Sequence, residues 1–219
     1  MIDPERLTAA SRALYARNLR VLQGFRLAET DRTHIAALLR LMAPRSHGVW
    51  VDIGCGFGEP ARIMRELRPD LSFWLVNNNT YQLSMAPDDM PQFCFDMHEL
   101  KFEDAMFDGA MMLYSLCHAD DFVQVLREAA RVTKPGGHLF VFDYARFAGD
   151  DRLAVEHLAA RFPPYDWLRG LAAAGGWHMD HAVLPTGDDT VFRSLFEDQK
   201  LYESIFDGAR PVIWWATKS

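Results

Sequence analysis

From residue 47 onward, short apolar runs alternate with stretches in which apolar residues recur every three or four positions. The first pattern predicts strands and the second predicts helices. The expected strands span 48–53, 71–77, 91–95, 107–113, 137–142, 177–183 and 211–217. The expected helices span 59–68, 80–86, 121–132, 152–174 with a break at Pro163-Pro164, and 190–206. This alternation favours one α/β domain, with a seven-stranded, mostly parallel sheet and helices on both faces.

The part of the chain before the first strand is helical and basic. Residues 5–22 and 34–41 predict two helices that can cap the sheet. Residues 1–45 hold eight arginines and four acids, so they carry +4, and the net charge of −7 leaves −11 for the rest. An acidic chain lacks the broad basic surface that a nucleic acid needs. The basic segment can still meet a small anion, although a solvated helix face explains it equally well.

A glycine-rich turn lies between the first expected strand and the helix that follows it. Its sequence is Val51-Asp52-Ile53-Gly54-Cys55-Gly56-Phe57-Gly58-Glu59-Pro60. Glycines let the backbone turn sharply and let a ligand approach where a Cβ would clash. The form Asp-x-Gly-x-Gly-x-Gly differs from the pyrophosphate fingerprint G-x-G-x-x-G. We therefore expect this loop to wrap the amino-acid end of S-adenosylmethionine rather than a diphosphate.

The second and third expected strands end in polar residues that suit the rest of such a cofactor. Asn77-Asn78-Asn79-Thr80-Tyr81-Gln82 begins where an acid usually binds ribose hydroxyls, and an amide can accept the same hydrogen bond. The asparagines also suit a plain turn before a helix. Phe93-Cys94-Phe95-Asp96-Met97 places an acid that can accept the adenine amino proton and a methionine that can pack on the ring. A loop start explains this acid equally well.

The cysteines and the ends of the chain bear on compartment and membrane contact. Cys55, Cys94 and Cys117 show no metal-type spacing and no even-numbered disulfide framework, which predicts a reducing, cytoplasmic setting. The segment Met1–Arg6 is polar and lacks the apolar region of a signal peptide. No apolar run approaches the roughly 18–20 residues that span a membrane. We expect no membrane span and no nucleic-acid partner.

Read together, these motifs resemble those of class I S-adenosylmethionine-dependent methyltransferases, and more narrowly those of the sterol and terpenoid C-methyltransferase branch. The resemblance covers residues 47–145, a little under half of the chain. The strings that carry it are Asp52-Ile53-Gly54-Cys55-Gly56-Phe57-Gly58-Glu59-Pro60, Asn77-Asn78-Asn79-Thr80-Tyr81-Gln82, Phe95-Asp96-Met97-His98, Cys117-His118-Ala119 and Arg131-Val132-Thr133-Lys134-Pro135-Gly136-Gly137.

The resemblance implies a Rossmann-like fold and a set of cofactor contacts. Residues 1–219 would form a single methyltransferase domain, with an N-terminal helical cap over 1–45, a cofactor-binding core over 46–145 and a substrate-side half over 146–219. The positions implied for the cofactor begin with Asp52, Gly54 and Gly56 at its methionine end. Asn77, with Asn78 and Gln82 nearby, would meet the ribose, while Asp96 and Met97 would hold the adenine.

The chain departs from this branch at the residue three places before Cys117. The branch usually has a glutamate there, held to stabilise a carbocation or help remove its proton, and this chain has Tyr114. A tyrosine ring can still stabilise a cation. His118 is the leading candidate for a general base because its ordinary pKa lies near neutrality, although a hydrogen-bonded structural histidine fits equally well. The alternatives on neighbouring strand ends are Tyr144, His98 and Asp143.

The size of the chain bears on the acceptor. Sterol-modifying relatives have longer flanking parts, so this chain should enclose a smaller substrate, such as a short prenyl diphosphate. Arginine forks suit phosphate oxygens. The expected diphosphate site comprises Arg12, Tyr15, Arg17, Asn18, Arg20 and Arg26. Mg²⁺ can share the diphosphate charge, although no carboxylate cluster demands it. Pairing of two copies through the N-terminal helices is compatible with the sequence.

These expectations lead to one leading function and two alternatives. The leading function is methylation of an alkene carbon of a small isoprenoid, such as isopentenyl or geranyl diphosphate, through a carbocation that is then deprotonated. A small-molecule O- or N-methyltransferase would need only a base near its nucleophile. A protein that binds S-adenosylmethionine without transferring methyl, such as a cyclase or a regulatory module, uses the same fold.

Overall fold

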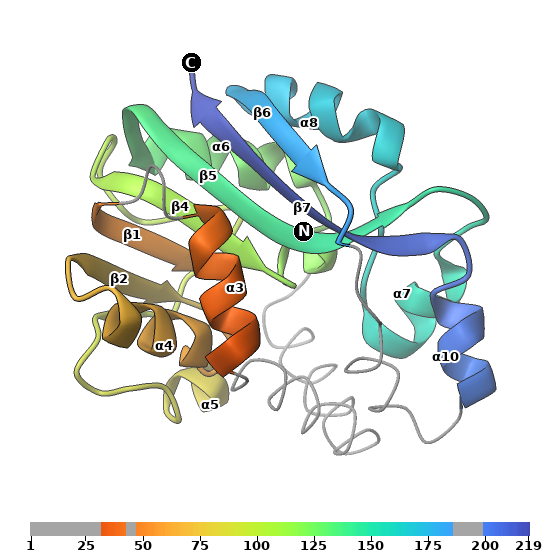
Figure 1. Ribbon diagram of the computed structural model, residues 1–219, viewed down its shortest axis with the longest axis horizontal. Coiled ribbons are helices and arrows are strands. Elements are labelled where there is room, and N and C mark those ends of the chain that lie inside the picture. The colour runs from red at the N-terminus through yellow and green to blue at the C-terminus, as the bar shows by residue number, and fades with distance from the viewer. Residues whose placement is uncertain (1–31, 43–46, 186–198) are drawn as a thin grey trace.

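The computed structural model describes residues 32–42, 47–185 and 199–219 (Figure 1). The expected helix over 5–22 lies outside these residues, as does the first part of the helix expected over 190–206. The second expected N-terminal helix is present as α3, Arg32–Met42, slightly longer than the predicted 34–41. No helix among the described residues is long and apolar enough to cross a membrane.

The centre of the fold is one seven-stranded sheet in the order β3-β2-β1-β4-β5-β7-β6. Every pairing from β3 to β5 is parallel, whereas β7 runs antiparallel to both β5 and β6. This confirms the expected mostly parallel α/β sheet. The strands are β1 (Gly48–Ile53), β2 (Leu71–Val76), β3 (Gln92–Phe93), β4 (Phe107–Leu113), β5 (Thr133–Arg146), β6 (Trp177–Val183) and β7 (Ala209–Lys218).

Helices cover both faces of this sheet, as expected. On one face, α3 and α4 (Glu59–Leu67) bury Ile35, Leu38, Ile63 and Met64 against β1, β2 and β4 (Figure 1). On the other face, α6 (Phe122–Val132) and α8 (Leu168–Ala174) pack on alternate side chains of the same strands. The residues of α3 are therefore part of the hydrophobic core, and this segment does more than cap the sheet.

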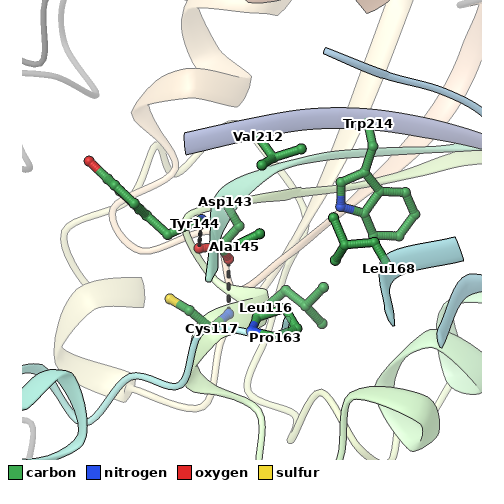
Figure 2. Close-up of a pocket in the computed structure, with 9 residues that line it drawn as sticks. All are labelled: Leu116, Cys117, Asp143, Tyr144, Ala145, Pro163, Leu168, Val212 and Trp214. Atoms are coloured by element: carbon green, nitrogen blue, oxygen red, sulfur yellow. Dashed lines mark hydrogen bonds between the residues drawn. The ribbon is translucent and has the colours of Figure 1, made fainter. Parts of the chain in front are cut away.

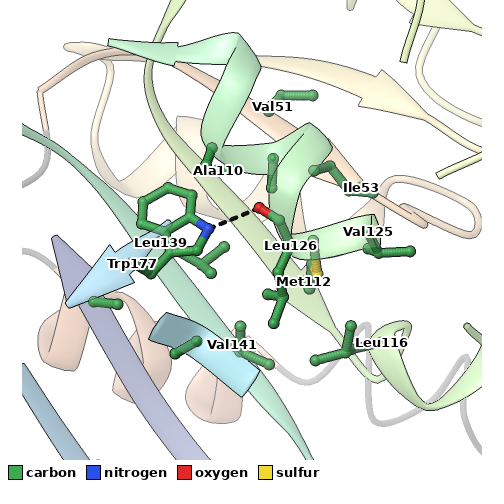
Figure 3. Close-up of a cluster of buried hydrophobic side chains, with 14 of the residues drawn as sticks. Val51, Ile53, Ala110, Met112, Leu116, Val125, Leu126, Leu139, Val141 and Trp177 are labelled. Atoms are coloured by element: carbon green, nitrogen blue, oxygen red, sulfur yellow. Dashed lines mark hydrogen bonds between the residues drawn. The ribbon is translucent and has the colours of Figure 1, made fainter. Parts of the chain in front are cut away.

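The core behind the sheet is anchored by one buried tryptophan. Trp177 opens β6 with 1% of its surface exposed, and its Nε1 donates a hydrogen bond of 2.9 Å to the Leu126 carbonyl of α6 (Figure 3). A buried indole needs such a partner, because an unpaired N–H away from water is costly. This contact ties β6, the last strand in the sheet, to the helix that covers the middle strands.

A third apolar cluster, here called the aromatic cluster, lies beyond the carboxyl ends of β4 and β5. It is closed by α7 (Arg152–Leu158) and α10 (Gln199–Ile205). Its ring-bearing members are Tyr144, Phe162, Tyr202 and Phe206, with Tyr114 packed against them. Ligands of parallel α/β sheets bind at this edge, and the aromatic cluster lies at the same edge.

Several predicted bounds were wrong. The strand expected over 91–95 covers only Gln92–Phe93, and the helix expected over 80–86 is the single turn α5, Thr80–Leu83. The strand expected over 137–142 is more than twice as long, because Thr133–Arg146 pairs on both sides with β4 and β7. The helix expected over 152–174 is divided into α7, a 3₁₀ turn at Tyr165–Trp167 and α8. The predicted break at Pro163-Pro164 therefore lies inside a longer connection.

Candidate functional site

The glycine-rich turn leaves the carboxyl end of β1 and starts α4. The backbone N–H groups of Gly54 and Cys55 both donate to the Val76 carbonyl, at 2.8 and 3.0 Å, so the turn is tied to the end of β2. Gly58 precedes α4 in the left-handed conformation, with φ of 70°, which favours glycine. The first turn of α4 therefore faces the same edge of the sheet as the strand ends.

Gly54 marks the closest approach between the turn and its neighbours. Its φ is +78°, and a Cβ added there would lie 2.4 Å from Ser115 Cβ and 3.6 Å from Met97 Cε. Ser115 is itself buried, and its hydroxyl donates a bond of 2.6 Å to the Ile53 carbonyl. The structure thus brings Gly54, predicted for the methionine end of the cofactor, close to Met97, predicted for the adenine.

Ser115 is a site residue that the sequence reasoning missed. Its hydrogen bond joins the end of β4 to the end of β1, and it therefore holds the backbone from which the glycine-rich turn begins. The available signal was a small polar residue directly after an apolar strand. Such a residue is common in turns, and its partner is far away in the sequence.

Asp52 lies at the end of β1 with only 2% of its surface exposed. No described residue donates a hydrogen bond that would stabilise its charged form. Burial therefore raises the pKa of Asp52 to about 8. A buried carboxyl group without a partner is costly unless a cation meets it. This position therefore suits a ligand that brings a positive charge to the end of β1.

Asn77 ends β2 and forms an amide pair with Gln82. Its Nδ2 donates to Gln82 Oε1 at 2.8 Å and lies 3.4 Å from the Gly56 carbonyl. Because Nδ2 is used within the protein, the acceptor oxygen Oδ1 is left to face a ligand hydroxyl. The structure brings Asn77 and Gln82, both predicted for the ribose side, together with Gly56, which was predicted for the methionine end; that these residues bind a ribose stays a prediction.

The Asn77–Gln82 pair allows a sharp test of this arrangement. Asn77→Asp alone leaves the new carboxylate beside the neutral Gln82 amide, and Gln82→Glu alone still accepts from Asn77, so each single change should cost less than half as much as the double one. The double variant places two carboxylates at the separation of the present 2.8 Å bond. We expect it to weaken S-adenosylmethionine binding by about tenfold or more, measured by calorimetry. Additive effects of the two changes would contradict this picture.

The other two asparagines of the string have different positions. Asn79 is buried and caps α5, because its side chain accepts hydrogen bonds from the backbone of Tyr81 and Gln82. The turn explanation of the asparagine string is therefore right for Asn79. Asn78 is half-buried at the start of this turn, next to the end of β2.

Asp96 follows β3 and is paired with His98. Asp96 Oδ1 lies 2.7 Å from His98 Nδ1 and accepts a 2.8 Å bond from the His98 backbone. The hydrogen bond to His98 holds the pKa of Asp96 below its usual value, and the same bond raises the pKa of His98. His98 is therefore engaged with Asp96, and not directed at the end of β4 as the alternative base would require.

Tyr114 stands directly after β4 in a conformation that is unusual for a residue with a side chain. Its φ is +55°, in the left-handed region, and its backbone N–H donates to the Phe142 carbonyl at 2.7 Å. Its ring lies 4.5 Å from that of Phe142, and its hydroxyl lies 3.4 Å from His34 Nε2 of α3. Backbone strain of this kind tends to occur at functional positions.

His118 follows the end of β4, and Asp143 lies near the carboxyl end of the neighbouring strand β5. His118 is exposed, and its Nδ1 lies 3.0 Å from the Ala159 carbonyl, so Nδ1 carries the proton and Nε2 is the basic nitrogen. The Asp143 carboxylate accepts bonds from the backbone of Cys117 and Tyr144, and burial raises its pKa. Asp143 thus holds the strand ends in place, which makes it a poor base.

Tyr144 is buried in the aromatic cluster. Its ring lies 4.6 Å from Phe206 and 5.5 Å from Phe162. Figure 2 shows Tyr144 pointing away from a small cavity of about 10 Å³, which lies on the other side of β5 beside Cys117 and Trp214. A cavity of this size holds at most one water molecule. This cavity is therefore too small to hold an organic ligand.

The predicted diphosphate site lies outside the described residues, because Arg12, Tyr15, Arg17, Asn18, Arg20 and Arg26 all precede residue 32. Among residues 32–42, 47–185 and 199–219, no three histidine, cysteine or acidic side chains gather in a way that could hold a metal ion. The described side chains thus leave both the anion site and the use of Mg²⁺ as predictions.

The described residues fit S-adenosylmethionine on chemical grounds. Asp52 offers an unpaired buried carboxylate for an ammonium group, and Asn77 offers an acceptor for a ribose hydroxyl. Asp96 and Met97 follow on the next strand end, next to the turn at Gly54. These groups would hold the amino acid, ribose and adenine in the order in which the cofactor presents them.

The chain is similar in sequence to known methyltransferases. Residues 51–141 match the family described as a methyltransferase domain. The chain is 32% identical over 116 residues to sterol 24-C-methyltransferase of Eremothecium gossypii. The matched segment covers 49% of this chain and 31% of that protein. It is 37% identical over 124 residues to 27-O-demethylrifamycin SV methyltransferase of Amycolatopsis mediterranei, and this match covers 52% of this chain and 43% of that protein. The chain thus spans less than half the length of these curated relatives.

Solved structures share the fold over a larger part of the chain. Geranyl diphosphate C-methyltransferase from Streptomyces coelicolor A3(2) superposes with a TM-score of 0.72 at 16% identity, covering 84% of this chain and 77% of that one. A sequence identity of 16% shows a shared fold and nothing about a shared function. Residues 51–141 are thus similar to the methyltransferase domain family and to sterol C-methyltransferases, and the chain has the class I S-adenosylmethionine methyltransferase fold.

Proposed function

We propose that this chain transfers a methyl group from S-adenosylmethionine to an alkene carbon of a small isoprenoid, with isopentenyl or geranyl diphosphate as the leading acceptor. The observation that carries this proposal is the aromatic cluster, which begins at Tyr114 beside the predicted cofactor site and continues through Tyr144. An apolar, ring-lined surface suits an isoprenoid. The similarity to a sterol C-methyltransferase supports the same class of acceptor.

The proposed reaction places clear demands on the residues around the acceptor. When bound, the cofactor supplies an electrophilic methyl group on a sulfonium centre and leaves as S-adenosylhomocysteine. Attack by the alkene π-electrons leaves a tertiary carbocation on the substrate, and loss of a neighbouring proton restores a double bond. The protein must position the alkene, exclude water and stabilise the cation.

Tyr114 and the aromatic cluster meet these demands. The face of the Tyr114 ring can stabilise a nearby cation in a dry site. The buried rings of Tyr144, Phe162 and Phe206 exclude water that would trap the carbocation. For proton removal, His118 offers Nε2, since its Nδ1 is held by the Ala159 carbonyl, and Tyr144 offers its phenol oxygen.

A substitution series at Tyr114 separates the ring from the hydroxyl. Tyr114→Phe keeps the ring, and we expect kcat to fall by less than about threefold. Tyr114→Leu removes the ring, and we expect kcat to fall by about tenfold to a hundredfold, because a desolvated cation–π contact contributes about 2 kcal/mol. Steady-state kinetics with the methylated isoprenoid as readout measures both. Equal losses in the two variants would rule out the ring's role in favour of the hydroxyl.

The proposed function is tested by incubating the protein with methyl-labelled S-adenosylmethionine and one acceptor at a time. The acceptors are isopentenyl, dimethylallyl, geranyl and farnesyl diphosphates and a sterol. Mass spectrometry should find the label on a carbon of one diphosphate, and a saturated analogue should stay unlabelled. If no isoprenoid takes the label while the cofactor still binds, the acceptor class is wrong.

The second candidate is O- or N-methylation of another small molecule. It is favoured by the similarity to a rifamycin O-methyltransferase, which is the higher of the two identities. In that case His118 would activate a hydroxyl or amine nucleophile, and no carbocation would form. Product analysis separates the candidates, since a new C–C bond excludes the second one. A cyclase or a regulatory module would yield no S-adenosylhomocysteine with any acceptor.

The remaining partners belong to the same proposal. Arg12, Arg17, Arg20 and Arg26, with Tyr15 and Asn18, would receive the diphosphate, and Mg²⁺ would share its charge. The described residues offer no three-residue metal site, so we propose that any Mg²⁺ arrives with the diphosphate. Arg→Ala changes in this segment should raise KM for the diphosphate and leave S-adenosylmethionine affinity unchanged.

A further inference from the structure

His98 bridges the end of β3 and the beginning of α6. On one side, its ring Nδ1 and its backbone N–H both reach Asp96 Oδ1, at 2.7 and 2.8 Å. On the other side, the backbone N–H of Asp121 approaches His98 Nε2 at 3.3 Å, and Gln124 Nε2 donates to the His98 carbonyl at 3.1 Å. The imidazole is therefore fixed at both nitrogens, and its backbone is fixed as well.

These contacts determine which nitrogen of His98 carries a proton. A backbone N–H can only donate a hydrogen bond, so Nε2 must accept the bond from Asp121. In the neutral ring the proton then resides on Nδ1, which donates to Asp96 Oδ1. The second nitrogen of a histidine commonly sets the tautomer in this way.

The tautomer in turn determines what Asp96 presents to a ligand. Both hydrogen bonds from His98 to the Asp96 side chain fall on Oδ1, and no described residue donates to Oδ2. The Asp96 side chain keeps 46% of its surface exposed, so Oδ2 is an open acceptor next to Met97. An acceptor of this kind favours the 6-amino group of adenine. It repels the 6-oxo group of hypoxanthine, which presents an acceptor in the same place.

We propose that His98 is a positioning residue that makes the site selective for adenine over a 6-oxopurine by holding Asp96 Oδ1 and directing Oδ2 at the base. This inference rests on the proposed cofactor site and goes beyond it, because it assigns base selectivity to a residue that does not touch the cofactor. The selectivity follows from a general rule, since it is costly for a ligand to cover an open acceptor such as Oδ2 with a second acceptor.

The test compares S-adenosylhomocysteine with S-inosylhomocysteine, whose bases differ in the 6-substituent and, as a consequence, in whether the adjacent N1 carries a proton. Calorimetry gives both affinities for the unaltered protein and for His98→Leu, His98→Asn and His178→Leu. His98→Leu removes both ring contacts, and we expect it to lower the ratio of the two affinities about tenfold, through weaker binding of the adenine ligand. His98→Asn can still donate to Asp96 and should keep most of the ratio. His178 is exposed on β6, so His178→Leu should change nothing.

The outcomes distinguish this inference from the proposed function. An unaltered protein that binds neither ligand would contradict the cofactor site itself. An unaltered protein that prefers the adenine ligand, with an unchanged ratio in His98→Leu, would overturn only the role of His98. Nitrogen NMR of the unaltered protein, at a pH above the pKa of His98, determines the tautomer of the His98 ring without any variant. The inference requires a protonated Nδ1 and a bare Nε2, and the opposite tautomer would overturn it.

Discussion

Replacing Asp52 by asparagine should weaken S-adenosylmethionine binding by at least about 100-fold and also stabilise the fold. The loss of affinity follows because the proposed ammonium partner would lose its buried countercharge, and breaking such a pair costs about 2–5 kcal/mol. The gain in stability follows because the carboxyl group is 2% exposed and no described residue donates a hydrogen bond to it. Function and stability should thus respond in opposite directions at this residue.

The gain in stability should depend on pH in a defined direction. Burial raises the pKa of Asp52 from 3.8 to about 8, so the folded protein keeps a proton that the unfolded chain releases between these values. The free energy of unfolding therefore falls as pH rises from about 4 to about 8. Asp52→Asn has no group that titrates at this position, so its free energy of unfolding should not fall in this way. Relative to the unaltered protein, the variant should be more stable by about 2–4 kcal/mol above pH 8 and equally stable below about pH 4.

Asp143 provides a matched control for this experiment. It is also a buried carboxyl group with a raised pKa, but it accepts hydrogen bonds from the backbone of Cys117 and Tyr144. Asp143→Asn would turn an amide N–H toward one of these donors, so it should destabilise the protein. Urea unfolding across the pH range compares the two variants, and calorimetry follows the cofactor. The same sign of change in both variants would contradict the difference in partners.

Much of the fold could be predicted because its signals are local. The apolar run over 48–53 and the glycines after it placed β1 and the turn correctly, since each depends on residues close in the sequence. The direction of β7 could not be read from periodicity, because antiparallel and parallel strands both alternate. The length of β5 also depends on long-range pairing, as Thr133–Arg146 is extended by its contacts with β7.

In the candidate site, too, contacts between residues close in the sequence could be predicted and long-range contacts could not. Asn77 and Gln82 are five positions apart, and the structure places them in contact. The partners of His98 and Ser115 lie at Asp121 and Ile53, far along the chain, and the sequence offered no means of finding them. The motif predicts which residues surround the cofactor, and the long-range hydrogen bonds decide which atoms of these residues remain available to a ligand.

Gly54→Ala should destabilise the protein by about 3 kcal/mol or more and abolish measurable cofactor binding. Two costs add at this position. The backbone has a φ of +78°, which costs a residue with a Cβ about 1–2 kcal/mol. The new Cβ would also lie 2.4 Å from Ser115 Cβ, and overpacking of this kind costs about 1–3 kcal/mol. Relief of the clash must move Ser115, whose hydroxyl holds the Ile53 carbonyl at the end of β1.

Gly136 separates these two costs. Its φ is +73°, but no heavy atom lies within 4 Å of a Cβ added there. Gly136→Ala should therefore cost only about 1–2 kcal/mol and leave the affinity for S-adenosylmethionine unchanged, because it lies at the opposite edge of the sheet from the turn. Urea unfolding and calorimetry of the two variants measure the difference. Equal destabilisation would mean that the contact with Ser115 relaxes freely, and the glycine-rich turn would then be shaped by backbone conformation alone.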